Sequence, residues 1–297
     1  MRQQNPVRQR AVVTGATSGI GEAIVRRLAE GGATVVMVGR SEERLDQARQ
    51  RVHAAVPHAD LTTERADLSL LSDVRALAKR LDEQEPPTIV ISNAAVIAPV
   101  AEVTSEGLQR ILVTNHLAPY LLLRSLVATV GERPARFVVV GASPSVLTRA
   151  PVDLDDLSCT TGRGLGPIPS FRPFVSYGRT KNMNAMFVYA LAERLAGTRI
   201  TVNGVHPGII KGTRLGLDAQ RGTLRLMTLA VRPFSGSLEA GADTPVWLAT
   251  SPEVEDVSGR FFVKRAQVAT APHTTDPARL DRLWEESAHL TGLPTGL

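Results

Sequence analysis

Tyr177 and Lys181 lie four positions apart in the segment YGRTK. On a helix, side chains with this spacing leave the same face one turn apart, so an ammonium would lie near a phenol. A free tyrosine has a pKa of about 10, and a neighbouring positive charge stabilises the phenolate and lowers that pKa. The pair could therefore work as a general acid and base. An ordinary surface helix can carry the same two residues, so this interpretation needs a second motif.

A glycine-rich turn, TGATSGIG at residues 14–21, supplies that second motif. It follows residues typical of a strand and precedes residues typical of a helix. Glycines let the backbone approach a pyrophosphate closely, and the helix N-terminus offers free N–H groups and the positive end of a dipole. A turn needed only to pack the helix on the strand would also be rich in glycine. The residues expected to contact a dinucleotide here are Gly15, Thr17, Ser18, Gly19, Ile20 and Gly21.

The second apolar run, TVVMVG, ends at Gly39 and Arg40 without a carboxylate. In a dinucleotide-binding fold this position lies beside the adenosine ribose, where an acidic residue would bind a free 2′-hydroxyl. A guanidinium suits a 2′-phosphate instead, through charge-assisted hydrogen bonds. We therefore expect NADP(H) as the cofactor. Since Ser41 is a good N-cap residue, Arg40 could also be a solvated residue at the start of a helix.

Strands and helices must alternate to bring these motifs together. A helical pattern at 19–30 and amphipathic segments further on separate short apolar runs. This alternation predicts one α/β domain of the Rossmann type, with a doubly wound parallel sheet covered by helices on both faces. The runs typical of strands lie at 11–14, 34–38, 89–91, 137–140 and 200–205.

Ligands of such sheets bind at the carboxyl ends of the strands. Residues that follow the third and fourth predicted strands are therefore also expected to contact the cofactor. They are Asp67, Leu68, Asn93, Ala94 and Ala95.

The predicted domain covers residues 10–265, after a basic tail at 1–9 and before a C-terminal extension at 266–297 with a short amphipathic helix at about 276–289. Two segments rich in Gly, Pro, Ser and Thr, 144–175 and 209–236, should leave the carboxyl edge of the sheet and contact the substrate. Their apolar side chains favour a pocket for an apolar or bulky carbonyl compound, or pack the loops on the domain. These side chains include Leu165, Ile168, Phe171, Phe174, Leu215, Leu217 and Phe234.

The composition is that of a globular enzyme. The chain has 297 residues, 43% of them hydrophobic, a net charge of +5 and a pI near 9.9. The arginines are scattered, which favours a solvated basic surface over a nucleic-acid interface. A single cysteine, Cys159, excludes an intramolecular disulfide and a cysteine zinc cage. His116 and His206 lack metal-ligand spacing, so we expect no metal and interpret both as structural.

Cellular location follows from the apolar runs. None approaches the roughly 20 residues needed to cross a bilayer, and the polar N-terminus MRQQNPVRQR does not resemble a secretory signal. We expect a cytoplasmic protein without stable membrane insertion.

Six motifs together resemble the short-chain dehydrogenase/reductase family, over about residues 10–265. The interval from Ser143 to Tyr177, the wording VHPG and the tail LWEESAHLTGL resemble its retinol-dehydrogenase-like branch. In chain order the motifs are TGATSGIG, SNAA at 92–95, NHLAPY at 115–120, VVVGAS at 138–143, YGRTK at 177–181 and HPG at 206–208.

The resemblance implies a catalytic tetrad. Tyr177 would donate a proton to a carbonyl being reduced, and Lys181 would lower the tyrosine pKa and hold the nicotinamide ribose. Ser143, with Ser145 as the alternative, would orient the carbonyl oxygen, and Asn115 would support a proton relay through water. A hydroxyl and a phenol that converge on one oxygen stabilise the charge that develops during hydride transfer.

The resemblance also implies that Pro207, Gly208 and Ile209 shape the nicotinamide pocket. The chain departs from the family pattern downstream, where Gly212 stands in place of a common Thr or Ser and Thr213 follows it. It departs again where Ser92 and Ala95 replace the first asparagine and the glycine of an NNAG element. These changes affect the predicted cofactor pocket and leave the proton chemistry intact.

The sequence thus predicts an NADP(H)-dependent interconversion of a carbonyl and an alcohol, with the physiological direction open. A catalytically silent NADP-binding redox sensor or scaffold is the alternative from a different class. The resemblance further implies a homodimer or homotetramer formed through two long helices, at about 103–130 and 176–196.

Overall fold

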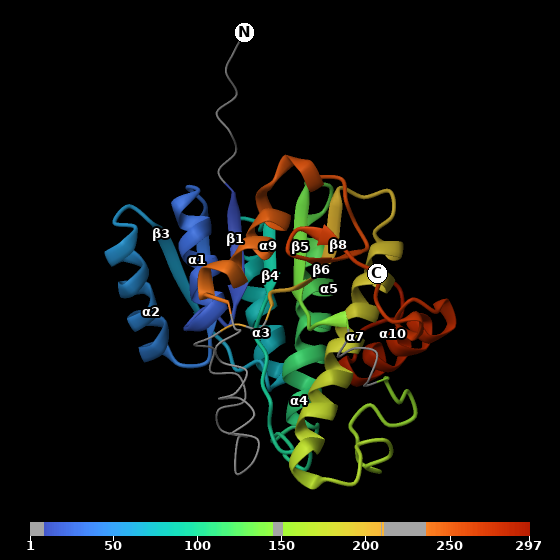
Figure 1. Cartoon of the computed structure of the whole chain (residues 1–297). Helices are drawn as coiled ribbons and strands as arrows, with labels where there is room; N and C mark the ends of the chain where they lie inside the picture. The colour runs from blue at the N-terminus through green and yellow to red at the C-terminus, as the bar shows by residue number, and fades with distance from the viewer. Residues whose placement is uncertain (1–8, 145–150, 209, 211–235) are drawn as a thin grey trace.

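One sheet organises the protein, as seen in a computed structural model that describes residues 9–144, 151–208, 210 and 236–297 (Figure 1). In this part of the chain eight strands pair in the order β3-β2-β1-β4-β5-β6-β7-β8. All neighbours are parallel except β7 and β8. The strands are β1 (Arg10–Thr14), β2 (Thr34–Gly39), β3 (Asp60–Arg65), β4 (Ile89–Ser92), β5 (Ala135–Val140), β6 (Ile200–His206), β7 (Arg260–Val263) and β8 (Ala266–Gln267).

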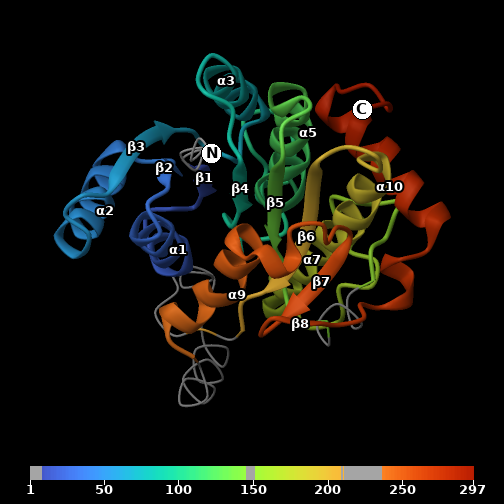
Figure 2. The same cartoon turned by 90° about the horizontal axis from the view of Figure 1, so that it is seen from above.

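Helices cover both faces of the sheet, so the predicted fold class is confirmed (Figure 2). One face carries α1 (Gly19–Glu30), α2 (Glu42–Ala55) and α9 (Leu238–Thr250). The opposite face carries α3 (Leu71–Asp82), α5 (Ala118–Val130) and α7 (Arg172–Arg194), with α10 (Pro277–Thr291) packed on α7.

Alternation along each strand explains why both faces are apolar. In β1, Val12 packs in the cluster with α3, α5 and α7, whereas Val13 packs in the cluster with α1 and α9. Both side chains are fully buried. Successive strand residues point to opposite faces, so a strand covered on both sides must be apolar throughout.

The chain reverses direction across the sheet at β1. From β1 it runs outward through β2 and β3, then returns to start β4 on the other side of β1. A crevice forms at the carboxyl ends of the strands where the order reverses, and ligands of doubly wound sheets bind there. This point lies between the ends of β1 and β4, at Thr14 and Ser92.

The first long helix is shorter than predicted and is interrupted. Instead of starting near residue 103, it starts with α4 (Arg110–Leu112), followed by a π-helical turn, η1 (Val113–Leu117), and then α5. Residues before it form a turn in which Gly107 has a φ of +79°, a conformation that ends regular helix. Residues 110–130 have the length and apolar composition of a membrane span, but 83% of their most apolar stretch is buried inside this fold.

The predicted C-terminal helix is confirmed as α10, which begins one residue later and extends two residues further than expected. The Asp276 carboxylate accepts a hydrogen bond from the Arg279 backbone N–H at 2.9 Å, and Gly292 ends the helix with a φ of +64°. Trp284 on α10 is 2% exposed and lies between α5 and α7. The C-terminal extension is therefore part of the core.

Short helices complete the described part of the chain. They are η2 (Pro169–Phe171), η4 (Pro252–Val254) and η5 (Pro272–Thr274).

Candidate active site

The glycine turn after β1 packs directly against the end of β4. Gly15 has a φ of +68°, and a Cβ atom there would lie 2.9 Å from Ala94 Cα. A Cβ atom on Gly21 would lie 2.2 Å from the Gly15 carbonyl oxygen. Only glycine fits at both positions, because these distances are shorter than van der Waals contact. Ser18, at the N-cap of α1, forms no side-chain cap hydrogen bond, which leaves the N-terminal N–H groups for a ligand.

Thr14 joins the predicted cofactor residues of β1 and β4. Its hydroxyl oxygen accepts hydrogen bonds from the backbone N–H groups of Asn93 and Ala94, at 3.0 and 3.1 Å. The Asn93 side-chain amide in turn donates to the Thr14 carbonyl at 3.0 Å. Thr14 is not among the site residues predicted from the sequence, because its partners lie about 80 residues further along the chain. Ala95 follows in the same partly buried segment.

The turn also touches the end of β2. The Ala16 N–H donates to the Val38 carbonyl at 3.2 Å, and a Cβ atom on Gly39 would lie 2.7 Å from Thr17 Cγ2. Arg40 follows directly and is exposed, with no ion pair to any described residue. The predicted N-cap is confirmed, since the Ser41 hydroxyl accepts from the Arg44 N–H at 3.3 Å. Arg40 therefore precedes the N-cap of α2 and directly follows Gly39, the residue that lies against Thr17 of the glycine turn.

The guanidinium of Arg51 contacts this turn, and the sequence did not predict this contact. Arg51, on α2, donates to the Thr17 carbonyl at 3.2 Å and forms an ion pair of 2.6 Å with Glu22 on α1. No spacing rule links residues 17, 22 and 51, so the contact follows only from how the two helices pack.

Asp67 and Leu68 lie at the same edge of the sheet. Asp67 Oδ1 accepts hydrogen bonds from the Ser69 N–H and hydroxyl at 2.9 and 2.7 Å, which gives this carboxylate a local turn to stabilise. Leu68 lines a small cavity together with Thr14 and Ala94. Leu68 is thus nearer to the glycine turn than its position in the sequence indicates.

Tyr177 and Lys181 lie on one helix, α7, as predicted. Lys181 is 2% exposed, and its Nζ donates to the Val140 carbonyl at the end of β5 at 2.9 Å. The same Nζ lies 5.6 Å from the centroid of the Tyr177 ring. This contact brings the pair to the carboxyl edge of the sheet, where Ser143 follows β5 three residues after Val140.

Burial controls the ionisation of this pair. It lowers the pKa of Lys181 to about 8 and raises the pKa of Tyr177 well above its ordinary value. We expected Lys181 to lower the tyrosine pKa, whereas the cause of the shift in this structure is desolvation of the phenol, which raises the pKa. Tyr177 is therefore protonated at neutral pH.

Asn115 lies in the π-helical turn and connects three parts of the site. Its Nδ2 donates to the Val96 carbonyl at 2.9 Å and to the Thr180 hydroxyl at 3.1 Å, and its Oδ1 accepts from the Val96 N–H at 2.8 Å. Thr180 in turn donates to the Tyr177 carbonyl at 2.8 Å. Asn115 thus links the segment after β4 to the first turns of α7.

The remaining predicted site residues divide between described and undescribed positions. Pro207 and Gly208 follow β6, and Gly208 has a φ of +94°, which favours glycine. Ile209 and Ser145 lie outside the described residues, as do Gly212 and Thr213.

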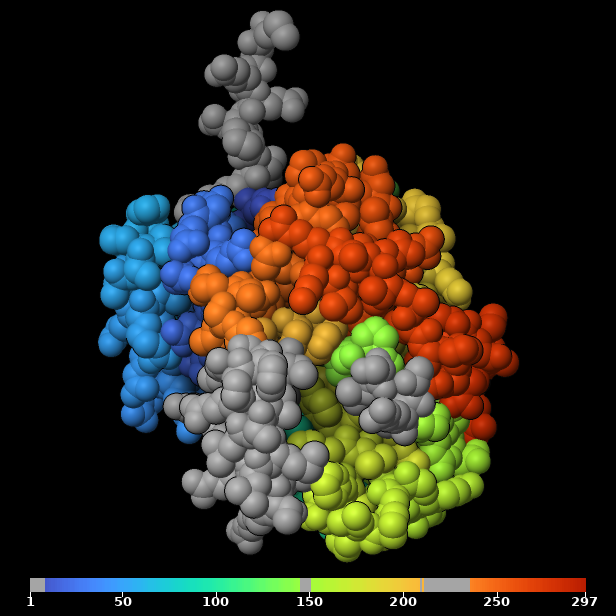
Figure 3. Space-filling view, viewed as in Figure 1, coloured from blue at the N-terminus to red at the C-terminus, as the bar shows by residue number. Residues whose placement is uncertain are grey.

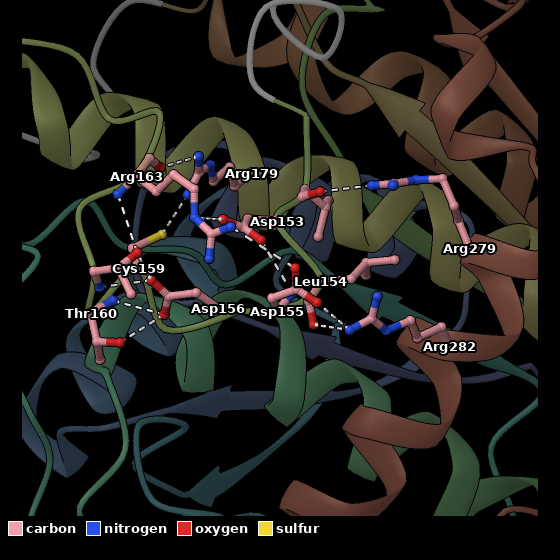
Figure 4. A network of polar contacts seen from close by, with 12 residues as sticks. Asp153, Leu154, Asp155, Asp156, Cys159, Thr160, Arg163, Arg179, Arg279 and Arg282 are labelled. Atoms are coloured by element: carbon pink, nitrogen blue, oxygen red, sulfur yellow. Dashed lines mark hydrogen bonds and ion pairs between the residues drawn. The ribbon is translucent and has the colours of Figure 1, made fainter.

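Residues 151–166, part of the predicted substrate loop, are held from two sides (Figure 4). On α7, Arg179 Nη2 donates to the Arg163 carbonyl at 2.6 Å, and Nη1 donates to Cys159 Sγ at 3.4 Å. On α10, Arg279 donates to the Val152 carbonyl at 2.7 Å, and Arg282 pairs with Asp155. The segment lies beside the C-terminal region at the surface (Figure 3).

Hydrogen bonds within residues 151–166 also hold this segment in place. Asp156 accepts hydrogen bonds from Thr160 and Thr161 at 2.6 to 2.8 Å, which lowers the pKa of its carboxyl to about 2 although desolvation opposes the change. Leu165 is 2% exposed and packs, whereas Ile168, just beyond the segment, is 53% exposed. Phe171 and Phe174 are partly buried. The predicted residues Leu215, Leu217 and Phe234 lie outside the described part of the chain.

The two histidines that we interpreted as structural differ. His116 is fully buried with both ring nitrogens in contact, Nδ1 with Asn184 Oδ1 at 3.4 Å and Nε2 with Ser287 Oγ at 2.8 Å. His206, at the end of β6, has a buried Nδ1 without a hydrogen-bond partner among the described residues. The two contacts of His116 agree with a structural role. A structural role does not explain the unpaired Nδ1 of His206. The described residues contain no group of His, Cys, Asp and Glu that could hold a metal ion.

The chain is similar to known oxidoreductases along its length. Residues 9–150 match the family model described as short chain dehydrogenase. Human retinol dehydrogenase 14 is 31% identical, over 95% of this chain and 86% of that protein. The Streptomyces sp. (strain C5) protein named "Putative daunorubicin C-13 ketoreductase DnrU" is 35% identical, over 95% of this chain and 92% of its own.

The fold has a close counterpart among solved structures. A Mycobacterium paratuberculosis protein superposes with a TM-score of 0.74 at 24% identity, covering 97% of this chain and 95% of that one. This likeness concerns the fold.

Proposed function

Because the chain belongs to the short-chain dehydrogenase/reductase family, in its retinol-dehydrogenase-like branch, we propose that it uses NADP(H) to interconvert a carbonyl compound and an alcohol. The observation that carries this proposal is the Lys181 hydrogen bond to Val140. It places the ammonium and the neighbouring Tyr177 phenol at the carboxyl end of β5, on the edge of the sheet that also holds the glycine turn.

The glycine turn fits a dinucleotide. Gly15 and Gly21 leave no volume for side chains, and the uncapped start of α1 presents N–H groups suited to a pyrophosphate. Arg40 is exposed and directly follows Gly39, which lies against Thr17 of the turn, and a guanidinium at this position suits a 2′-phosphate. These observations support NADP(H) over NAD(H).

Tyr177 is the proposed proton donor. A bound nicotinamide would supply hydride to the carbonyl carbon, and the phenol would transfer its proton to the carbonyl oxygen, which becomes the alcohol hydroxyl. Burial keeps the phenol protonated at neutral pH, as reduction requires. Lys181, buried beside the ring, would then stabilise the phenolate that remains, and Ser143 would orient the carbonyl oxygen.

Asn115 is proposed to act mainly by position. Both of its amide hydrogens are already used, one on Val96 and one on Thr180. Through Thr180 it fixes the turn of α7 that carries Tyr177. Support for a water relay would then come from this fixed geometry and not from proton transfer by the amide.

The substrate is proposed to be an apolar or bulky carbonyl compound. The exposed Ile168 and the partly buried Phe171 and Phe174 lie where α7 begins, near the proposed site. The names of the two relatives, a retinol dehydrogenase and a ketoreductase, describe reactions on large apolar molecules or on a ketone.

Consumption of NADPH with a panel of apolar ketones and aldehydes tests the proposal. The wild type should turn over at least one of them, whereas Tyr177→Phe should lose turnover by a factor of about 10² or more and still bind NADPH. Near-normal turnover of Tyr177→Phe would refute the mechanism. NADPH binding without turnover on the whole panel would favour the redox-sensor alternative.

A further inference from the structure

His206 lies on the face of the sheet that carries the proposed catalytic pair. Val202, four residues before it on β6, packs in the cluster with α7, whereas Val205 packs in the cluster with α9. Strand residues two apart share a face, so Val202, Gly204 and His206 all point toward α7.

The contacts of Phe261 confirm that this face of β6 is directed toward α7. A Cβ atom on Gly204 would lie 2.5 Å from the Phe261 ring, and Phe261 packs with Ala185 of α7. His206 is the next residue on this face toward the carboxyl edge of the sheet. Beyond it the chain turns at Pro207 and Gly208.

Lys181 is a close neighbour of His206. Val205 pairs with Val140, the residue whose carbonyl accepts the Lys181 hydrogen bond, so His206 lies one residue beyond that pair. Burial first, and the Lys181 charge second, lower the pKa of His206 to about 4. The imidazole is therefore neutral at physiological pH, with one nitrogen that donates and one that accepts.

The buried Nδ1 of His206 lacks a hydrogen-bond partner among the described residues. Buried polar atoms are nearly always paired, because an unpaired one loses the hydrogen bond that water would provide. His116, on the same side of the sheet, illustrates the rule with contacts at both nitrogens. At His206 the unpaired Nδ1 belongs to a side chain at the carboxyl end of β6, close enough to the Lys181 ammonium for its charge to lower the pKa of the imidazole.

We propose that His206, through Nδ1, forms a hydrogen bond with the nicotinamide riboside half of the cofactor, next to Lys181. This inference rests on the proposed function. The cofactor is favoured over the substrate because Nδ1 is buried at the level of the strand ends, where a dinucleotide crosses such a sheet, while the substrate segments extend beyond that edge.

Two ligands separate the halves of the cofactor site: NADPH, and adenosine 2′,5′-bisphosphate, which lacks the nicotinamide. For His206→Leu we expect the Kd of NADPH to rise about threefold to tenfold, as for loss of one neutral hydrogen bond, while the Kd of the bisphosphate stays unchanged. His206→Asn should restore NADPH binding, because its amide occupies the position of Nδ1. His206→Gln, whose amide reaches the position of Nε2, should not.

His273 provides a matched control. Its Nε2 is also buried without a partner among the described residues, but it lies in η5, between β8 and α10. His273→Leu should leave both affinities unchanged. Thermal unfolding of each variant identifies loss of fold, and the comparison of Asn with Gln keeps the inference testable if the Leu variant is unstable.

Two results for His206→Leu would overturn the inference. One is an unchanged NADPH affinity, with or without a higher KM for the carbonyl substrate, and the other is an equal loss of affinity for both ligands. A wild type that binds neither ligand would overturn the proposed function as well. Wild-type turnover with full NADPH affinity in His206→Leu would overturn this inference alone.

Discussion

Lys181 is a single residue whose burial makes the folded protein sensitive to pH. Its pKa falls from 10.5 to about 8 on folding, since desolvation disfavours the ammonium. Between these two values the unfolded chain binds the proton more tightly than the folded one. Lys181 therefore makes folding less favourable at pH 7 than at pH 10.

Replacing Lys181 by methionine should reveal this contribution. The stability of the wild type relative to Lys181→Met should rise by on the order of 2 kcal/mol between pH 7.5 and pH 9.5, measured by urea unfolding at each pH. Lys79→Met is the control, because the Lys79 side chain on α3 is 79% exposed and should show no such change. Equal pH dependence in wild type and Lys181→Met would contradict the role of burial.

Arg40 should decide between the two nicotinamide cofactors. In Arg40→Ser, kcat/KM for NADPH should fall about 10-fold to 100-fold, since charge-assisted hydrogen bonds to a phosphate are lost, while the value for NADH changes little. Arg44→Ser is the matched control, because Arg44 is exposed on the first turn of α2. The assignment fails if the wild type itself prefers NADH.

Local patterns predicted single site residues better than their partners. The spacing of Tyr177 and Lys181 predicts one helix face, which the structure confirms. The Val140 carbonyl, the Thr180 hydroxyl and Arg51 could not be predicted, because each contact joins residues that only the folded sheet brings together. The catalytic and cofactor roles stay predictions until the variants are measured.

At the scale of elements, residues 151–166 depend on one buried side chain of α7. Arg179 is buried and is the α7 side chain that holds Cys159 and the Arg163 carbonyl. In Arg179→Met the segment should open more often, so trypsin should cleave after Arg163 several times faster than in the wild type. The free energy of unfolding should also fall by about 1–3 kcal/mol, because the Arg163 carbonyl loses its hydrogen-bond donor.

Arg199→Met serves as the control for Arg179, because Arg199 is exposed before β6 and its side chain makes no contact with this segment in the described structure. An unchanged cleavage rate after Arg163 in Arg179→Met would show that the other contacts of the segment hold it without Arg179, among them those from Arg172 on α7 and from Arg279 and Arg282 on α10.

Elements with strong local patterns were predictable, and others were not. The sequence predicts β1, α1 and β2 almost to the residue, because a strand, a glycine turn and an amphipathic helix follow each other closely. It did not predict α9, which contains Pro245, a residue that normally disfavours a helix interior. The π-helical turn at 113–117 also escaped prediction, since no local sequence pattern distinguishes a single π-helical turn from the α-helix on either side of it.

At the scale of the whole molecule, α10 covers the helices that we expected to form an oligomer. Tyr120 donates to the Trp284 carbonyl at 2.8 Å, and the guanidinium groups of Arg124 and Arg194 lie 4.4 and 4.2 Å from the Trp284 ring. Arg124 also donates to the Pro294 carbonyl at 2.7 Å. A second copy could reach these parts of α5 and α7 only if the C-terminal segment moved.

The protein should therefore be a monomer in light scattering, with the face of α5 and α7 under Trp284 occupied by its own chain. Trp284→Ala should cost about 3–5 kcal/mol of stability and promote self-association, because it empties the contact between α10 and α7. Trp247→Ala on the partly exposed side of α9 is the matched control and should stay monomeric. A stable wild-type dimer would show that this face, or another, still assembles.

The Trp284 environment also gives the protein an optical property. The chain has two tryptophans, and the other, Trp247, is partly exposed and donates to Glu253 at 2.8 Å. In a Trp247→Phe background the ultraviolet emission would come from Trp284 alone, enclosed by two cations and two aromatic rings. The emission wavelength of this single indole would then report, without any added label, whether the C-terminal segment is seated or released.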